Sequence, residues 1–140
     1  MSDRAFVDTN IWVYTVDAAD PVRRARALAA IAPDGGRELV ISTQVLAEFY
    51  AVVTRKLAVP LTPDAARALA VQMAALTVVT VDASLVTAAI DGCRAWGISI
   101  WDALIIRAAE VAGCRTLLSE DLADGVEYGT VRVTNPLRPA

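Results

Sequence analysis

The chain has 140 residues, of which 56% are hydrophobic and 21% charged, with a net charge of −3 and no histidine. This length suits a single domain, residues 1–140, and the even spread of apolar residues predicts strands buried on both faces. The lack of histidine excludes Ser-His-Asp triads, Cys-His pairs and histidine-based zinc sites, which leaves carboxylates, hydroxyls or metal-activated water for acid–base chemistry.

The sequence contains no candidate for a membrane span. Its longest uncharged stretch, residues 68–81, falls short of the roughly 18 apolar residues required. Residues 1–4 lead directly into a predicted strand and do not resemble a signal peptide, so we expect a cytoplasmic protein. Cys93 and Cys114 lack the spacing of metal or redox sites and are predicted to be small buried hydrophobes.

The first half of the chain alternates short apolar runs with segments that begin at helix-capping residues. Capping types and proline at the first helical position mark helix starts. The expected elements are a strand at 5–7, a short helix from Thr9, a helix at 21–31, a break at 33–36, a strand at 39–41 and a helix from Ser42 through Val53.

The second half repeats this alternation. The expected elements are a helix from Pro63 to about Ala75, a strand at 78–81, a helix from Asp82 to Trp96, a helix from Ser99 or Ile100 to Gly113, a strand at 116–119, a polar turn at 120–125 and a short edge strand at 131–133. Strands that alternate with helices predict an α/β fold, in which a mainly parallel sheet carries helices on both faces.

Four acidic residues lie in apolar company. Asp8 and Asp121 follow predicted strands, and the carboxyl ends of parallel strands are where open α/β folds bind ligands. Asp102 begins an apolar helix, and Glu48 is one turn from Val45 and Val52 on an apolar helix stripe. A carboxylate beside a core is costly unless it is paired or binds a metal. We therefore expect all four to converge on one site.

Carboxylates brought together repel one another unless a cation lies between them. A hard divalent ion with oxygen ligands, Mg²⁺ or Mn²⁺, suits such a site and suits phosphate substrates. Such an ion lowers the pKa of water and so supplies a nucleophile without histidine. Thr9 and Asn10 are expected to hold water or substrate behind the ligands, and Asp124 is a candidate fifth acid.

Three of the four acids also have a simpler interpretation. Asp102 can be interpreted as a helix-capping charge, Asp121 as an ordinary turn residue, and Glu48 as the partner of an arginine. Three other acids, Asp82, Asp91 and Glu110, are interpreted as caps or solvated charges.

Four blocks, in this order and spacing, resemble the PIN-domain family and are most similar to the VapC-type toxins of bacterial toxin–antitoxin pairs. The resemblance covers nearly the whole chain. The blocks are Phe6-Val7-Asp8-Thr9-Asn10, the segment 42–49, the segment 98–105, and Leu117-Leu118-Ser119-Glu120-Asp121-Leu122.

This resemblance implies a three-layer α/β/α sandwich, a homodimer, and a metal-dependent endoribonuclease that an antitoxin inhibits by covering the site. The substrate would be single-stranded or structured RNA. The family's acidic positions fall on Asp8, Glu48, Asp102 and Asp121, all acidic here. Arg107 departs from the small residue expected at its position, and we interpret it as a helix-surface charge in preference to a contact with substrate or antitoxin.

Two rival functions remain open. Beside the endoribonuclease, the rivals are a PIN-like RNA- or protein-binding regulatory module without turnover and a different phosphate-transfer enzyme such as an aspartyl-phosphate phosphatase. The phosphatase requires a second aspartate two residues after the first, where this chain has Asn10. Basic and aromatic residues offer contacts for RNA or protein, although a solvated face and core packing also account for them. They are Arg23, Arg24, Arg26, Arg55 and Lys56, and Trp12, Tyr14, Phe49 and Tyr50.

Overall fold

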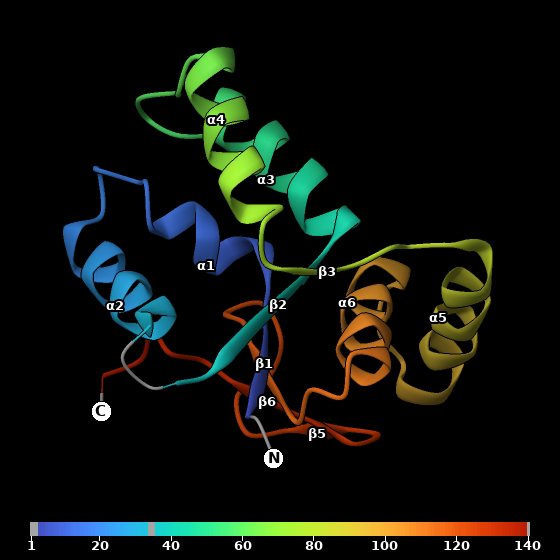
Figure 1. Ribbon diagram of the computed structural model, residues 1–140. Helices are drawn as coiled ribbons and strands as arrows, with labels where there is room; N and C mark the ends of the chain where they lie inside the picture. Colours follow the sequence, from blue (N-terminus) through green and yellow to red (C-terminus); the bar gives the residue numbers. More distant parts are fainter. Residues whose placement is uncertain (1–2, 34–35, 140) are drawn as a thin grey trace.

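The computed structural model describes residues 3–33 and 36–139. Strands and helices alternate along most of the chain (Figure 1). In chain order they are β1 (Arg4–Val7), α1 (Thr9–Tyr14), α2 (Pro21–Ile31), β2 (Glu38–Ser42), α3 (Thr43–Arg55), α4 (Pro63–Met73), β3 (Thr77–Val79), α5 (Ala83–Trp96), α6 (Ile100–Val111), β4 (Thr116–Leu118), β5 (Glu127–Tyr128) and β6 (Val131–Thr134).

The strands form one sheet in the order β3-β2-β1-β4-β6-β5. All neighbouring pairs are parallel except β5 and β6, which form an antiparallel hairpin. From β1 the chain first builds outward through β2 and β3 and later returns to place β4 on the other side of β1. The order therefore reverses between β1 and β4, and the carboxyl ends of strands at such a point form a binding crevice.

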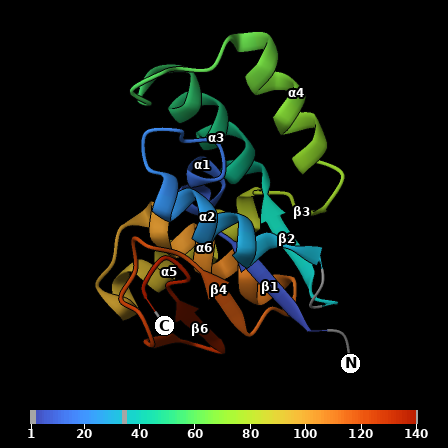
Figure 2. The same ribbon diagram turned by 90° about the vertical axis from the view of Figure 1, so that its left-hand side faces the viewer.

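Helices cover both faces of the sheet, as the sequence predicts. The pair α5 and α6 packs on one face, and α1 and α2 lie on the other (Figure 1). Helix α3 continues directly from the carboxyl end of β2 and pairs with α4, and together they project beyond the sheet (Figure 2). The expected three-layer α/β/α sandwich is confirmed.

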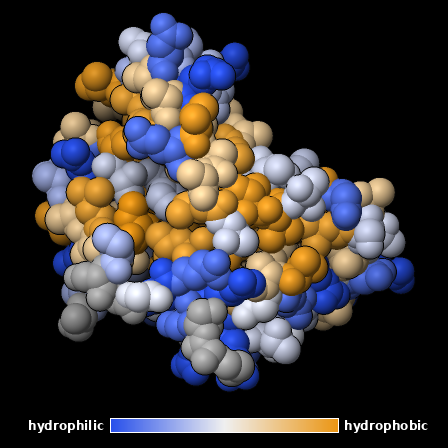
Figure 3. Space-filling model, in the orientation of Figure 1, coloured by the Kyte–Doolittle hydropathy of each residue, from blue (hydrophilic) through white to orange (hydrophobic). Residues whose placement is uncertain are grey.

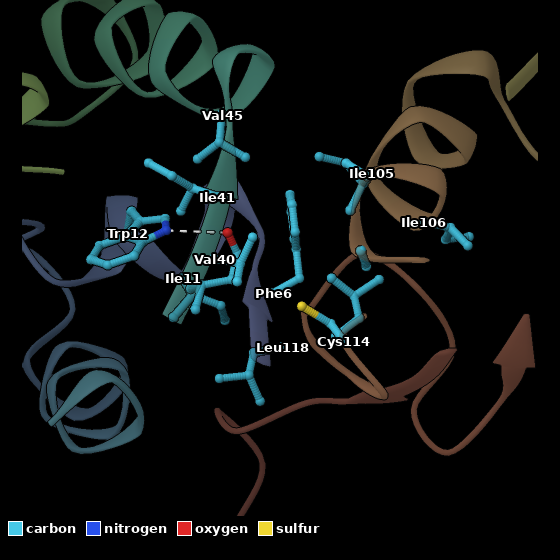
Figure 4. Close-up of a cluster of buried hydrophobic side chains, with 14 of the residues drawn as sticks. Phe6, Ile11, Trp12, Val40, Ile41, Val45, Ile105, Ile106, Cys114 and Leu118 are labelled. Carbon is cyan, nitrogen blue, oxygen red and sulfur yellow. Dashed lines mark hydrogen bonds between the residues drawn. The ribbon is translucent and has the colours of Figure 1, made fainter. Parts of the chain in front are cut away.

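The buried side chains form one hydrophobic cluster around β1, β2 and β4 (Figure 4). Phe6, Val40 and Leu117 are fully buried, which fits strands covered on both faces. The indole of Trp12 packs into this cluster and its Nε1 donates to the Val7 carbonyl at 3.2 Å. Cys114 is also buried and Cys93 half-buried, both as free thiols packed with the core, as predicted.

Most predicted strands agree with the structure to within one residue at each end, and two predictions differ by more, one in its extent and one in its place in the sheet. The strand expected at 78–81 is β3 at 77–79, because the Val81 N–H donates to the Thr43 hydroxyl at 3.1 Å and leaves the ladder. The prediction of an edge strand at 131–133 is wrong. Strand β6 lies between β4 and β5, which turns back at Gly129 (φ 59°).

Two further sequence predictions concern chain breaks and membranes. The break predicted at 33–36 falls partly on residues 34 and 35, which lie outside the described residues. In the part of the chain that the structure describes, no helix has both the length and the apolar character needed to cross a bilayer.

The interpretation of Arg107 as a helix-surface charge is also wrong. Its side chain is only 26% exposed, and its guanidinium lies 4.6 Å from the centroid of the Trp96 ring. Nε donates to the Ala88 carbonyl at 2.9 Å, and a second nitrogen donates to Glu110 at 2.8 Å. Gly92 leaves room for the Trp96 ring, because a Cβ at this position would lie only 2.7 Å from the ring. Arg107 therefore joins α6 to α5.

We expect Arg107→Ala to lower the free energy of unfolding by about 1–3 kcal/mol, because a cation–π contact and a charged hydrogen bond are lost together. Arg107→Lys should restore little of it, since an ammonium group cannot stack on the ring and bond both acceptors. Urea denaturation followed by circular dichroism measures both changes. Full stability of the alanine variant would contradict this role.

Candidate functional site

The register of β1 and β4 brings two distant segments together at the carboxyl edge of the sheet. Val7 pairs with Leu118, and the Asp8 N–H donates to the Leu118 carbonyl at 2.9 Å. The residues that follow these strands, Asp8 and Ser119, are therefore neighbours. The Ser119 hydroxyl donates to Asp8 Oδ2 at 2.8 Å.

Asp8 is a buried carboxylate, with 5% of its surface exposed. Its Oδ1 accepts from the Thr9 N–H at 2.7 Å, so Asp8 also caps helix α1, and Asn10 Nδ2 lies 3.4 Å from Oδ2. Desolvation raises the pKa of Asp8 to about 6, the hydrogen bonds from Ser119 and Thr9 oppose this rise, and repulsion from Asp121 and Glu48 adds to it. The fold holds Asp8 in place at a cost to its charged form.

Glu48 lies half-buried on α3, on the face turned to α1. Its Oε2 is 3.4 Å from the Thr9 hydroxyl, and its Oε1 accepts from Gln44 Nε2 at 2.6 Å. Gln44 Nε2 also lies 3.3 Å from the Trp101 carbonyl at the start of α6. Gln44 thus ties the Glu48 carboxylate to the helix that carries Asp102.

Asp102 and Asp121 complete the group of acids. Asp102 lies in the first turn of α6, where Ser99 caps the helix and accepts from the Asp102 N–H at 3.1 Å. Burial raises the pKa of Asp102, the Ser99 side chain opposes this, and repulsion from Asp121 adds to it. Asp121 is exposed, and its N–H donates to the Ser119 hydroxyl at 3.2 Å.

Electrostatic repulsion links the four carboxylates in pairs: Asp8 with Glu48, Asp8 with Asp121, and Asp121 with Asp102. Within residues 3–33 and 36–139, no ion pair involves any of them. The arginine partner considered for Glu48 is thus not among its contacts there. The fold therefore gathers negative charge without protein cations to offset it.

These residues fit a hard divalent cation by their chemistry, because the donors are carboxylate, hydroxyl and amide oxygens. The side chains as they stand are not in coordination geometry: over the described residues, no three acidic side chains meet closely enough to hold one ion. The Oε1 of Gln44 is buried beside them without a hydrogen-bond partner in the described chain. Metal binding by Asp8, Glu48, Asp102 and Asp121 stays a prediction.

A pocket of about 340 Å³ opens beside two of these acids, Glu48 and Asp121, between α1, α3 and the loop after β4, and Asp102 does not line it. Among the residues that line it are Thr9, Asn10, Glu48 and Asp121, and Asp8 lies buried beside them. The pocket can therefore admit a polar ligand to Glu48 and Asp121.

A model of the PIN domain matches residues 5–123, most of the chain. The chain belongs to the PIN-domain family. The match includes all four acids. No curated protein matches the sequence significantly.

Solved structures share the fold of this PIN domain at low sequence identity. VapC20 of Mycobacterium tuberculosis, a toxin that cleaves the sarcin–ricin loop, is 21% identical with a TM-score of 0.62, over 84% of this chain and 89% of that one. A toxin–antitoxin complex from Klebsiella pneumoniae is 15% identical with a TM-score of 0.67, over 94% of this chain and 97% of that one. DNA-bound VapBC from Salmonella typhimurium is 18% identical with a TM-score of 0.64, over 97% of this chain and 99% of that one.

The structure distinguishes among the remaining predicted site residues of the PIN domain. Thr9 and Asn10 contact the acids, and Asn10 Oδ1 also accepts from the Glu120 N–H at 3.1 Å. Asp124 contacts the C-terminal segment instead, where it accepts from the Asn135 N–H at 2.8 Å and lies 3.5 Å from Arg138. None of its contacts among the described residues reaches the four acids.

Sequence reasoning missed two residues of the site. Ser119 is fully buried and bonds Asp8, Asn10 and the Asp121 backbone, and Gln44 orients Glu48. A hydroxyl at the end of a buried strand and an amide one turn before Glu48 are the signals that could have indicated them.

The aromatic residues considered as groove candidates have different roles. Phe49 and Trp12 are buried in the core, as the packing interpretation predicts. Tyr14 donates to Glu120 at 2.9 Å, and Tyr50 is 40% exposed.

We expect Asp8→Asn to stabilise the metal-free protein at pH 7.5. A folded-state pKa raised from 3.8 to about 6 stabilises the fold fully below pH 3.8, and that stabilisation is lost as pH rises through 6. The asparagine amide stays uncharged, so the variant does not lose this part of the free energy of unfolding, which is roughly 3 kcal/mol at most. Thermal unfolding in chelator should show a higher Tm for the variant at pH 7.5 and a vanishing gain at pH 4. A lower Tm for the variant at pH 7.5 would contradict the burial cost.

Proposed function

We propose that this PIN domain is a Mg²⁺- or Mn²⁺-dependent endoribonuclease that cleaves single-stranded RNA, as the toxin of a type II toxin–antitoxin system in the cytoplasm. The observation that carries the proposal is the buried Asp8 carboxylate beside Glu48 and Asp121, without an ion pair among the described residues. The sarcin–ricin loop cleaved by the structurally similar VapC20 is an RNA target, which supports the substrate class.

Asp8, Glu48, Asp102 and Asp121 would hold the ion. When bound, Mg²⁺ or Mn²⁺ supplies Lewis-acid chemistry, lowering the pKa of water and offsetting charge on a phosphodiester. The chain's own contribution is orientation. Ser119 and the Thr9 N–H fix both oxygens of Asp8, and Gln44 fixes Glu48. Asn10 joins the loops after β1 and β4 and so keeps Asp8 and Asp121 on one edge.

Substitution of a residue that only supports a metal ligand typically lowers activity roughly 10- to 100-fold. We expect Asp8→Asn and Asp102→Asn, which change proposed ligands themselves, each to reduce cleavage of single-stranded RNA by more than this. The substrate is a fluorescent RNA oligonucleotide incubated with Mg²⁺ or Mn²⁺. Asp91→Asn is the matched control, because Asp91 is an exposed acid on α5 and does not line the pocket beside Glu48 and Asp121.

Cleavage in chelator, or activity that survives either substitution, would contradict the metal-dependent mechanism. RNA binding without cleavage in any divalent metal would favour the alternative, a PIN-like regulatory module without turnover.

We further propose that an antitoxin occupies an apolar groove of about 390 Å³ between α2, α3 and α4. Similar folds are found in toxin–antitoxin complexes, which supports such a partner. Leu28, Leu69 and Leu76 line the groove together with Trp12 and Phe49. A groove lined this way suits the apolar face of a partner helix or extended segment.

We expect Leu28→Glu to weaken antitoxin binding at least tenfold, because it places a charge in an apolar contact. Leu28 is 44% exposed, so the change should spare the fold. The protein encoded by the adjacent open reading frame is the partner for calorimetric titration. Val71→Glu is the control, since Val71 is 55% exposed on α4 but does not line the groove. Equal affinities of both variants for the partner would contradict this docking site.

We also propose a homodimer. Apolar surface gathers across the middle of the face drawn in Figure 3, around β3 and α6. Helices α5 and α6 leave large apolar side chains exposed, namely Val86, Ile90, Trp101 and Val111. Exposed apolar surface of this kind is typical of protein contacts.

A further inference from the structure

We propose that Lys56 binds an RNA phosphate next to the one that is cleaved, an inference that rests on the proposed function. Lys56 follows the last turn of α3 and lines the pocket beside Glu48 and Asp121. Of the residues described around that pocket, Lys56 alone carries positive charge, whereas Asp17, Glu48, Glu120 and Asp121 carry negative charge.

The amine of Lys56 is available to a ligand. Over the described residues it takes part in no ion pair and no side-chain hydrogen bond, and its residue is exposed. Arg23, which was considered for RNA, already has partners in the protein: it bonds Asp20 at 3.0 Å and Glu120 at 3.2 Å and lies over the Tyr14 ring. Arg23 charge is therefore balanced within the protein, and Lys56 charge is not.

The other basic candidates also have different positions. Arg24 donates to the Thr15 carbonyl at 3.2 Å and Arg26 to the Leu137 carbonyl at 2.8 Å, which ties both to the α2 side of the molecule. Arg55 does not line the pocket. From the sequence, Arg55 and Lys56 are equal candidates for an RNA contact, but in the structure only Lys56 lines the pocket.

Helix geometry determines which phosphate Lys56 can reach. Glu48 and Val52 line the pocket from one face of α3, and Lys56, the residue that caps the end of this helix, lines it at the same four-residue spacing. Two intervals of four residues place Lys56 roughly 12 Å from Glu48 along the helix axis. Glu48 repels a phosphate and Lys56 attracts one, so the phosphate that Lys56 holds lies at the Lys56 end of the pocket, away from Glu48. Lys56 therefore takes a neighbouring phosphate and positions the strand, while the acids act on the cleaved one.

A contact with phosphate alone predicts weaker binding that does not depend on sequence. We expect Lys56→Gln to weaken RNA binding roughly two- to fivefold at low salt, as for an exposed ion pair, equally for oligo-A and oligo-U. The slope of log affinity against log salt should fall in magnitude by about 0.7, the value for one single-strand phosphate. Lys56→Arg should restore both values.

Fluorescence anisotropy with Mg²⁺ tests this in the Asp102→Asn parent, which leaves the RNA intact. Arg94→Gln is the charge-matched control, because Arg94 is exposed on α5, which contributes nothing to the pocket. The expected result is a weaker affinity and smaller salt slope for Lys56→Gln only. Unchanged binding, an equal loss in the Arg94 control, or a parent that binds no RNA would each overturn the proposal.

The wild-type background separates this proposal from the function on which it rests. With Lys56→Gln alone, KM should rise while the single-turnover rate at saturating RNA stays unchanged, since the lost contact is not with the reacting phosphate. A wild-type protein that binds RNA without cleaving it would defeat the nuclease and leave the Lys56 contact standing. Cleavage with no effect of the substitution would defeat only the Lys56 contact.

Discussion

The parallel pairing of β1 with β4 is the constraint on which the rest of the site depends. It aligns Val7 with Leu118, so the first polar residues after each strand, Asp8 and Ser119, meet at the switch point of the sheet. A shift of one residue in this register would turn alternate side chains to the other face and separate the two loops. The apolar core that fixes the register thereby fixes the position of Asp8.

That position has an electrostatic cost, which the protein retains. Asp8 is buried, repelled by Glu48 and Asp121, and held by donors from Thr9 and Ser119. Such hydrogen bonds orient a carboxylate but do not neutralise it. A fold selected for stability alone would have an apolar residue at position 8, or would pair the Asp8 carboxylate with a cation. Position 8 is an aspartate, and no cation pairs with it among the described contacts, which favours a metal-dependent function.

Local sequence signals predict some of these features and not others. Caps and apolar runs indicate α6 at Ser99 and the strand before Asp8, because they depend on neighbouring residues only. The prediction that β6 is an edge strand is wrong because β5, the true edge strand, is only two residues long and too short to show a sequence pattern. Arg107 stacks on Trp96 from another helix, and Ser119 bonds Asp8 across 111 residues of sequence, so neighbouring residues do not reveal these partners. Gln44 and Glu48 are four residues apart on α3, a spacing that the local sequence does show.

The most direct test of the central claim is a crystal of the wild-type protein soaked in Mn²⁺ and measured for anomalous scattering. The account predicts a peak at the carboxyl edge of β1 and β4, within coordination distance of Asp8 and of carboxylate oxygens from Asp102, Asp121 or Glu48. An Asp8 carboxylate without an ion at saturating Mn²⁺, or one paired with a lysine or arginine, would contradict it.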